Sequence, residues 1–233
     1  MGVHVKQFKI LAIALVMCAV IGCVGPDPVL KAALDQQVAQ IRSRTTVYSA
    51  PKAAIPMPLK VGQWIQTKGV DECGDLALTT IKLVGQEGES FWQETVGQTA
   101  YGGMTIRALI NFGDLTDPNT KKILRIQIKG KDGHVAEYLT EAVDFMRTLG
   151  PSLSSASWKG LLQEDVQVPA GRFVQCYKGP LSITTLLGTT TGSVWWHSGV
   201  PINGIVKSVG HGGVGGGTVE LIAFGLEGAT SEF

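Results

Sequence analysis

The sequence predicts a mainly β protein with a meandering antiparallel sheet, one short helix before the sheet and a second helix inserted into it. The main observation is the period of the apolar residues, which is two from Leu59 onward, as in strands with one dry and one wet face. Glycine-bearing turns, such as those at residues 85–88 and 129–133, separate the alternating runs. Residues 28–42 and 136–149 instead have apolar positions at helical spacing.

Residues 28–42 are expected to form a short amphipathic helix. A proline stands near its start, and its apolar positions follow helical spacing: Leu30, Leu34, Val38 and Ile41. Its polar face has few cations, so packing on the protein's own sheet is favoured over contact with a membrane surface. Residues 45–58 contain three prolines and no period, and are expected to be a semi-extended linker.

The alternating runs predict strands in ten segments: residues 62–68, 76–84, 90–96, 104–112, 124–129, 164–168, 172–178, 193–197, 205–209 and 218–224. In the run 104–112 the apolar side chains at even positions share one face. On the next run Leu124, Ile126 and Ile128 do the same. Each strand is therefore expected to have one apolar and one polar face.

Residues 166–173 form the clearest hairpin. Pro169 presets the first turn residue, and Gly171 can adopt the left-handed conformation that a three-residue loop needs. The helix at 136–149, ended by Gly150 and Pro151, is expected to cover part of the sheet.

The first two dozen residues form a separate segment. Lys6 and Lys9 precede the apolar run 10–21, and Gly22 and Cys23 close it. The run is shorter than the span of about 20 apolar residues that a bilayer requires, and its order of features resembles a bacterial lipoprotein signal peptide. The resemblance implies cleavage after residue 22 and lipidation of Cys23. A valine rather than an aspartate after Cys23 favours the outer membrane, with the protein facing the periplasm.

The expected organisation has three parts: a signal peptide over residues 1–22, an anchored segment with the short helix and linker over 23–58, and one β domain over 59–233. The chain carries 20 Lys and Arg against 19 Asp and Glu, so it has no electrostatic footprint for nucleic acid. The expected partners are a membrane, through the lipid, and a hydrophobic ligand or an envelope protein.

The cysteines suggest a disulfide. Cys18 would leave with the signal and Cys23 would carry the lipid, so Cys73 and Cys176 remain free to pair. An oxidising periplasm favours a bond between them. The alternative is two separate buried thiols, because cysteine is often a small core residue.

The later part of the chain resembles a known family. The motifs are Val-Pro-Ala-Gly-Arg-Phe at 168–173, Ser-Val-Trp-Trp-His-Ser-Gly-Val-Pro-Ile-Asn-Gly-Ile-Val-Lys at 193–207 and Val-Glu-Leu-Ile at 219–222. With the runs at 62–65 and 91–94, they look like envelope lipoproteins similar to the Lol-type lipoprotein carriers. The resemblance implies a curved half-barrel of about 8–11 antiparallel strands. In such a fold a concave apolar face, covered by a helix, holds an acyl chain or another hydrophobic ligand.

Tryptophans are the candidate ligand-binding residues, because an indole combines a large apolar area with one hydrogen-bond donor. The candidates are Trp64, Trp92, Trp195 and Trp196. Trp195 and Trp196 are adjacent in a predicted strand, so only one of them can line the concave face. The alternative is that the tryptophans fill the core.

The sequence carries no catalytic or metal-binding signature. Outside the signal, His134, His197 and His211 lie in separate segments without ligand spacing, and are expected to be solvated or capping residues. The glycine-rich run 210–217 lacks the lysine and hydroxyl residue of a P-loop and is expected to be a hairpin loop. No Gly-x-Ser-x-Gly motif occurs, which leaves a Ser-His-Asp site assembled from distant strands as the enzymatic alternative. We therefore expect a protein that is not an enzyme and needs no metal or cofactor.

The function expected from the sequence is that of a non-catalytic envelope lipoprotein that binds a hydrophobic ligand or lipid component. The alternative is a structural or assembly lipoprotein that holds a protein partner through an exposed apolar patch, for instance on the 28–42 helix.

Overall fold

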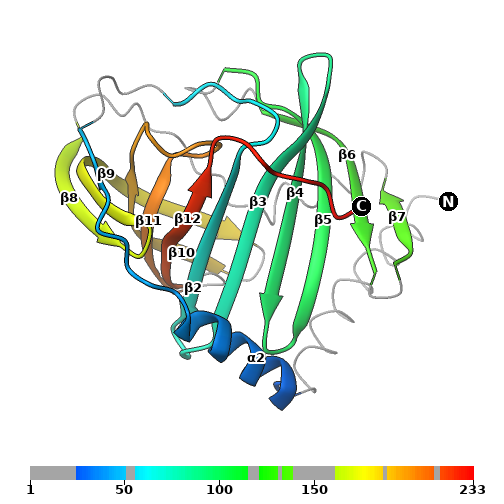
Figure 1. The fold of residues 1–233 in the computed structure, drawn as a ribbon, viewed down its shortest axis with the longest axis horizontal. Coiled ribbons are helices and arrows are strands. Elements are labelled where there is room, and N and C mark those ends of the chain that lie inside the picture. The colour runs from blue at the N-terminus through cyan, green and yellow to red at the C-terminus, as the bar shows by residue number, and fades with distance from the viewer. Residues whose placement is uncertain are drawn as a thin grey trace, which may run out of the picture.

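The computed structural model describes residues 25–50, 56–114, 121–130, 133–138, 161–185, 188–212 and 216–233. A single sheet of 12 strands dominates this part of the chain, so the expectation of a mainly β protein is confirmed (Figure 1). The sheet is open. Within the described residues its lateral edges, β7 (Val135–Tyr138) and β8 (Leu162–Val168), do not pair with each other, and such a sheet fits a half-barrel.

The other strands of the sheet are β1 (Val47–Tyr48), β2 (Trp64–Asp71), β3 (Leu76–Glu87), β4 (Ser90–Thr99), β5 (Gly102–Asn111), β6 (Lys122–Lys129), β9 (Gly171–Thr185), β10 (Gly188–Trp196), β11 (Ile205–His211) and β12 (Gly217–Gly225). All ten segments that the alternation marks as strands lie largely within strands of the structure. Most of the strands extend beyond the predicted ends, because strand ends carry weaker patterns than strand centres.

The sheet consists of two antiparallel meanders. One runs from β2 to β7 and the other from β8 to β12, each with neighbouring strands in chain order. Pairing of β12 with β2 joins the two meanders in the middle of the sheet. In Figure 1 the strands β8 to β11 turn out of the plane of β2 to β5, so the sheet is curved.

Irregularities in strand pairing contribute to this curvature. Register shifts occur in five of the strand pairs, including one between Leu83 and Gly85 and one between Leu109 and Ile110. A bulge bends the strand that carries it and increases the local twist. The shift at Leu109 leaves Leu124 without a register partner and 43% exposed, so the prediction that Leu124 shares the apolar face of Ile126 is wrong.

The hairpin at 166–173 is present but tighter than predicted. Val168 pairs with Gly171, so the loop holds two residues rather than three. Gly171 has a φ of 142°, and a Cβ there would lie 2.6 Å from the carbonyl oxygen of Thr46. Only glycine therefore lets the chain leading into β1 lie against β9.

Strand β1 lies within the segment expected to be a linker. Tyr48 pairs with Phe173 in parallel register, and their rings stack with centroids 4.3 Å apart. Phe173 is fully buried and also contacts Phe224. Part of the expected linker is therefore docked in the core through an aromatic cluster.

The largest core cluster draws on both meanders and has these buried members: Ile65, Leu83, Val166, Val168, Ala170, Phe173, Cys176, Trp195, Val200, Ile202, Val206 and Leu221. Its members pack side chains of β8, β9, β10, β11 and β12 against those of β2 and β3. This packing holds the curved part of the sheet to the flatter part.

Helix α2 (Pro28–Ala39) is the one helix among the described residues. The Asp27 side chain caps it by accepting the backbone N–H of Val29 at 2.8 Å. Leu34 is its only buried residue and packs against Leu78 and Ile222 of the sheet. Val38, one turn further along the helix, and Ile41 just after it pack against the same cluster.

The expected covering helix is wrong at its start. Residues 136–138 belong to β7, where Ile128 of β6 pairs with Ala136. Alternation in this short stretch suits an edge strand better than a helical turn. The remainder of the predicted helix, residues 139–149, lies outside the described residues.

Candidate functional site

The strands β3 to β6 have two chemically different faces. On one face Ile81, Ile106 and Ile128 form a register row, and Leu83, Ala108 and Ile126 form the next. We call these six residues the apolar face. Ala108 and Ile126 are buried, whereas Ile81, Ile106 and Ile128 are half-buried. On β4 the rows pass through Gln93 and Thr95, whose side chains hydrogen-bond to each other.

The opposite side of the same strands carries charges, and its residues define the polar face. One register row runs through Lys82, Glu94, Arg107, Gln127 and Glu137. Arg107 donates to Gln127 at 2.7 Å and Arg125 to Glu137 at 3.2 Å, so neighbouring strands are joined by polar cross-strand pairs. Along this row, Lys82 pairs with the opposite charge of Glu94, and Gln127 hydrogen-bonds to both Arg107 and Glu137.

A shallow pocket of about 440 Å³ lies at the end of the apolar face. Its described lining residues are Leu59, Glu89, Phe91, Asn111, Phe112 and Gly113. Phe91 and Phe112 meet edge to face with centroids 6.2 Å apart. The ammonium group of Lys121 lies 5.2 Å from the Phe112 centroid, which places a cation beside an apolar wall.

The four tryptophans do not come together at one site. Trp92 is on the polar face, where its indole N–H donates to Glu87 at 2.7 Å and the guanidinium of Arg107 lies 4.8 Å from its ring. Trp64 of β2 pairs with Lys82 and so shares this side, and its ring occupies the space that Gly225 leaves open.

Trp195 and Trp196 point to opposite sides of β10, as predicted. The Trp195 indole donates to Glu164, and the Lys178 ammonium lies 4.8 Å from its ring. Trp196 packs with Leu181 and Val194. Protein groups therefore already contact all four candidate tryptophans.

Isoleucines, not tryptophans, form the apolar face. Period-two alternation predicts Ile106, Ile126 and Ile128 on the apolar side of their strands. No signal in the sequence shows whether such a side packs in the protein core or binds a ligand. Strand order was the missing information, because Ile81 meets them only through the pairing of β3 with β4.

No disulfide joins Cys73 and Cys176, so that prediction is wrong. Cys73 is exposed in the turn after β2, and Cys176 is fully buried in β9. Four strand spacings of about 4.8 Å separate β9 from β2 in the sheet, far beyond the reach of a disulfide. Burial, with the nearby charges of Asp165 and Glu164, raises the pKa of the Cys176 thiol to about 12.

His197 is a buried structural histidine. Its Nδ1 accepts the backbone N–H of Gly199 at 3.0 Å, so Nε2 carries the proton and donates to the Ser49 carbonyl at 2.9 Å. Burial lowers the pKa of His197 below its usual range, and the Ser49 carbonyl opposes this effect. The ring thus fixes the turn after β10 to the segment that follows β1.

The glycine-rich run forms part of the β11–β12 hairpin, as predicted, with Gly210 paired to Gly217. Its described residues contact the turn after β2, because Gly212 donates its N–H to Glu72 at 3.2 Å and His211 lies 3.5 Å from the same oxygen. The carboxylate of Glu72 therefore already accepts the glycine amide that an external anion would use.

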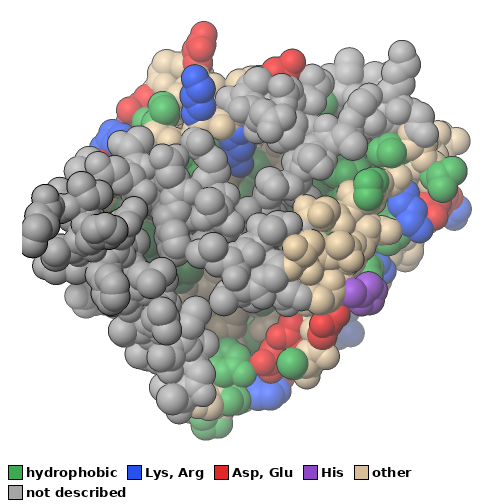
Figure 2. Space-filling view, turned by 180° about the vertical axis from the view of Figure 1, so that it is seen from behind, with side chains coloured by type: hydrophobic (Ala, Val, Ile, Leu, Met, Phe, Trp, Pro, Cys, Tyr) green, Lys and Arg blue, Asp and Glu red, His purple; other side chains and the backbone are tan. Residues whose placement is uncertain are grey.

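Charges of both signs are mixed on the molecule. Seen from behind, the described side chains at the margin show acidic, basic and hydrophobic groups interspersed (Figure 2). Within the described ranges, no group of His, Cys, Asp or Glu is arranged to hold a metal ion. In the same residues no helix is long and apolar enough to cross a membrane.

Comparison of the chain with models of protein families, with curated proteins and with solved structures gives no match. The functional argument therefore rests on the residues of this chain. Residues 1–24, which contain the predicted signal and Cys23, lie outside the described part.

Proposed function

We propose that the protein is an envelope lipoprotein, anchored through lipid at Cys23, whose apolar face binds a hydrophobic ligand. The observation that supports this proposal is the contrast between the two faces of β3 to β6. On β3, β5 and β6 isoleucines, leucine and alanine line one face in register, with Gln93 and Thr95 between them on β4, while ion pairs and hydrogen bonds occupy the other face. No catalytic step is part of this proposal.

An extended apolar chain is the ligand that this geometry suits. The row through Ile81, Ile106 and Ile128 crosses from β3 to β6, a width of three strand spacings or about 14 Å. Removal of apolar surface from water contributes about 25 cal/mol per Å². Half-buried isoleucines still have apolar area that a ligand can cover.

The pocket at the end of the apolar face suits the head of such a ligand. Its volume of about 440 Å³ lies in the range of small-molecule sites. Phe91 and Phe112 supply apolar walls, Glu89 and Asn111 supply polar groups, and the Lys121 ammonium lies beside the Phe112 ring. We therefore infer an amphiphile with a long apolar chain and a polar head.

Binding of a fluorescent acyl probe to the purified full chain tests this proposal. Ile106→Glu is expected to weaken binding by at least about tenfold, because the ligand would have to desolvate a carboxylate. Thr105→Glu is the matched control, since Thr105 is the next residue along β5 and faces the polar side. Equal affinity of both variants, or no binding to the unmodified chain, would refute the proposal.

A second candidate is an assembly lipoprotein that holds a protein partner. Its support comes from α2, where Val29 is 74% and Leu30 is 37% exposed. Purification from membranes followed by mass spectrometry separates the two candidates. Co-purifying lipid supports the first, and a stoichiometric protein that is lost from a Val29→Ser, Leu30→Ser variant supports the second.

A further inference from the structure

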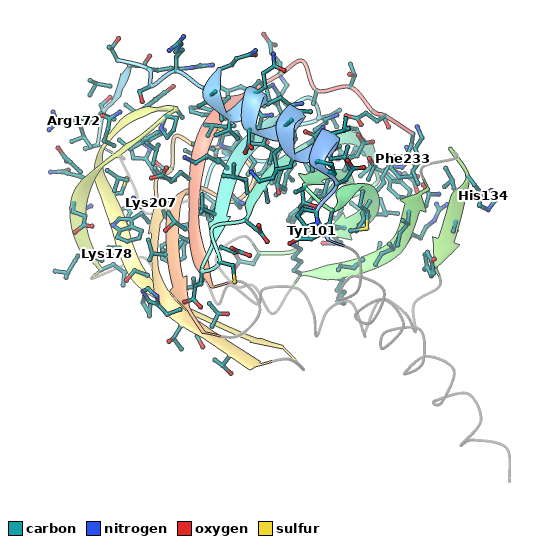
Figure 3. All side chains as sticks on the ribbon, turned by 90° about the horizontal axis from the view of Figure 1, so that it is seen from below. Tyr101, His134, Arg172, Lys178, Lys207 and Phe233 are labelled. Carbon is teal, nitrogen blue, oxygen red and sulfur yellow. The ribbon has the colours of Figure 1, made fainter. Side chains whose placement is uncertain are left out.

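The segment after β12 lies across the polar face of the sheet. It comprises residues 226–233 and runs in front of β3, β4 and β5 toward β6 (Figure 1). The N–H of Ala229 donates to the Gly62 carbonyl at 2.9 Å. Phe233, labelled in Figure 3, lies beside the green strands of the first meander.

A fully buried carboxylate, that of Glu94 on β4, binds this segment. The Ser231 hydroxyl donates to Glu94 Oε2 at 2.8 Å, and the backbone N–H of Glu232 donates to Oε1 at 3.0 Å. Lys82 Nζ lies 3.4 Å from Oε1. Burial of a carboxylate without hydrogen-bond donors is costly. Any segment that covers Glu94 must therefore supply donors to it, as residues 231 and 232 do.

Three cations complete the contacts. Lys82 donates to the Glu232 carboxylate at 2.5 Å and to the Thr230 carbonyl at 3.4 Å. Lys129 donates to the Glu232 carbonyl oxygen. The guanidinium of Arg107 lies between two rings, 4.8 Å from the Trp92 centroid and 4.5 Å from that of Phe233.

These contacts recognise both main chain and side chains. Main-chain groups of residues 230 and 232 are hydrogen-bonded, while a hydroxyl at 231, an acid at 232 and an aromatic ring at 233 each have a specific partner. Main-chain hydrogen bonds combined with side-chain pockets are the usual basis of peptide recognition.

We propose that Lys82, Glu94, Arg107 and Lys129 form a peptide-binding site for an extended Ser-acidic-aromatic segment, which residues 231–233 of this chain occupy in cis. The site takes a second polypeptide with the same chemistry when the cis segment leaves. It lies on the opposite side of the sheet from the apolar face and is independent of ligand binding there.

The first test uses the full chain with a weakened cis segment, since a tethered segment competes at an effective concentration of about millimolar. A Ser231→Ala, Phe233→Ala variant is titrated with a fluorescein-labelled Gly-Ala-Thr-Ser-Glu-Phe peptide, and anisotropy is measured. The peptide is expected to bind this variant at least about tenfold more tightly than the unmodified chain. Adding Glu94→Gln should remove that gain.

Glu220→Gln is the matched control. Glu220 lies on the same side of the sheet and pairs with Lys68 and Lys207, outside the proposed site. Peptide binding should survive this change. Failure of the weakened variant to bind better than the unmodified chain, or equal effects of Glu94→Gln and Glu220→Gln, would overturn the proposal.

The second test needs no variant. Hydrogen exchange at the Glu232 amide is compared with that at the Leu83 amide, which donates to Gln63 in the core. The Glu232 amide is expected to exchange faster through local opening, and excess unlabelled peptide should accelerate it at least about twofold. Equal protection of both amides, unchanged by peptide, would show that the segment opens only with the whole fold and would overturn the proposal.

Discussion

Neutral His197 should make stability depend on pH in a defined direction. Its folded-state pKa is lowered by burial, so the unfolded chain binds a proton more readily than the folded one. The contribution of His197 to the free energy of unfolding is therefore complete above about pH 6.5, the usual value for the unfolded chain. It falls as the pH decreases from there toward the folded-state pKa, by up to about 1.4 kcal/mol per pH unit.

His197→Gln removes this titration. The ring is 3% exposed and makes two hydrogen bonds, to Gly199 and Ser49. Loss of a buried hydrogen-bond partner costs about 1–3 kcal/mol. The variant should be less stable than the unmodified protein by this amount at neutral pH, with a difference that shrinks as the pH falls below about 6.5.

Urea unfolding followed by tryptophan fluorescence, at several values between about pH 7.5 and pH 5.5, measures the effect. His211→Gln is the control, because the His211 side chain is 76% exposed. At neutral pH this control should lose much less stability than His197→Gln, because no buried hydrogen-bond partner is removed. A His197→Gln difference that stays constant with pH would refute the reasoning.

Backbone strain, thiol burial and the lipid anchor can each be tested separately. Gly171→Ala should lower the free energy of unfolding by about 1–3 kcal/mol and more than Gly74→Ala, since both glycines have positive φ but a Cβ at Gly74 meets nothing within 4 Å. A maleimide should label Cys73 in the folded protein but Cys176 only after unfolding; modification of both at equal rates would contradict the burial of Cys176. Cys23→Ser should move the protein from the membrane to the soluble fraction, and a variant that stays with the membrane would contradict the anchor.

Local features of the fold could be predicted from the sequence because they depend on neighbouring residues. Alternation of apolar and polar residues predicted the strands, and the proline at 169 with the glycine at 171 predicted the hairpin at 166–173. The error at residues 136–138 has the same origin, since apolar spacing over one turn cannot distinguish a short edge strand from a helix start.

Long-range arrangement could not be predicted in this way. The pairing of β12 with β2 separates Cys73 from Cys176 by three intervening strands, and no local pattern indicates it. Parity of cysteines and an oxidising compartment favoured a bond that the strand order rules out.

The candidate site shows the same division. Dry and wet faces followed from the alternation, but the tryptophans were chosen for their chemistry alone. Trp92 lies under Arg107 on the polar face and Trp195 beside Lys178, so neither belongs to the apolar face. Glu94 carried no signal in the sequence, because the Ser231 and Glu232 groups that hydrogen-bond to it lie more than 130 residues away along the chain.

Photochemical labelling is the most direct test of ligand binding on the apolar face. The full chain is incubated with an acyl probe that carries a photoreactive group near the end of its chain, irradiated and digested, and the labelled residues are identified by mass spectrometry. The proposed function predicts label on apolar-face residues such as Ile81, Ile106 and Ile128, with loss of that label in Ile106→Glu but not in Thr105→Glu. Label confined to α2 or to the polar face, or no saturable label, would contradict it.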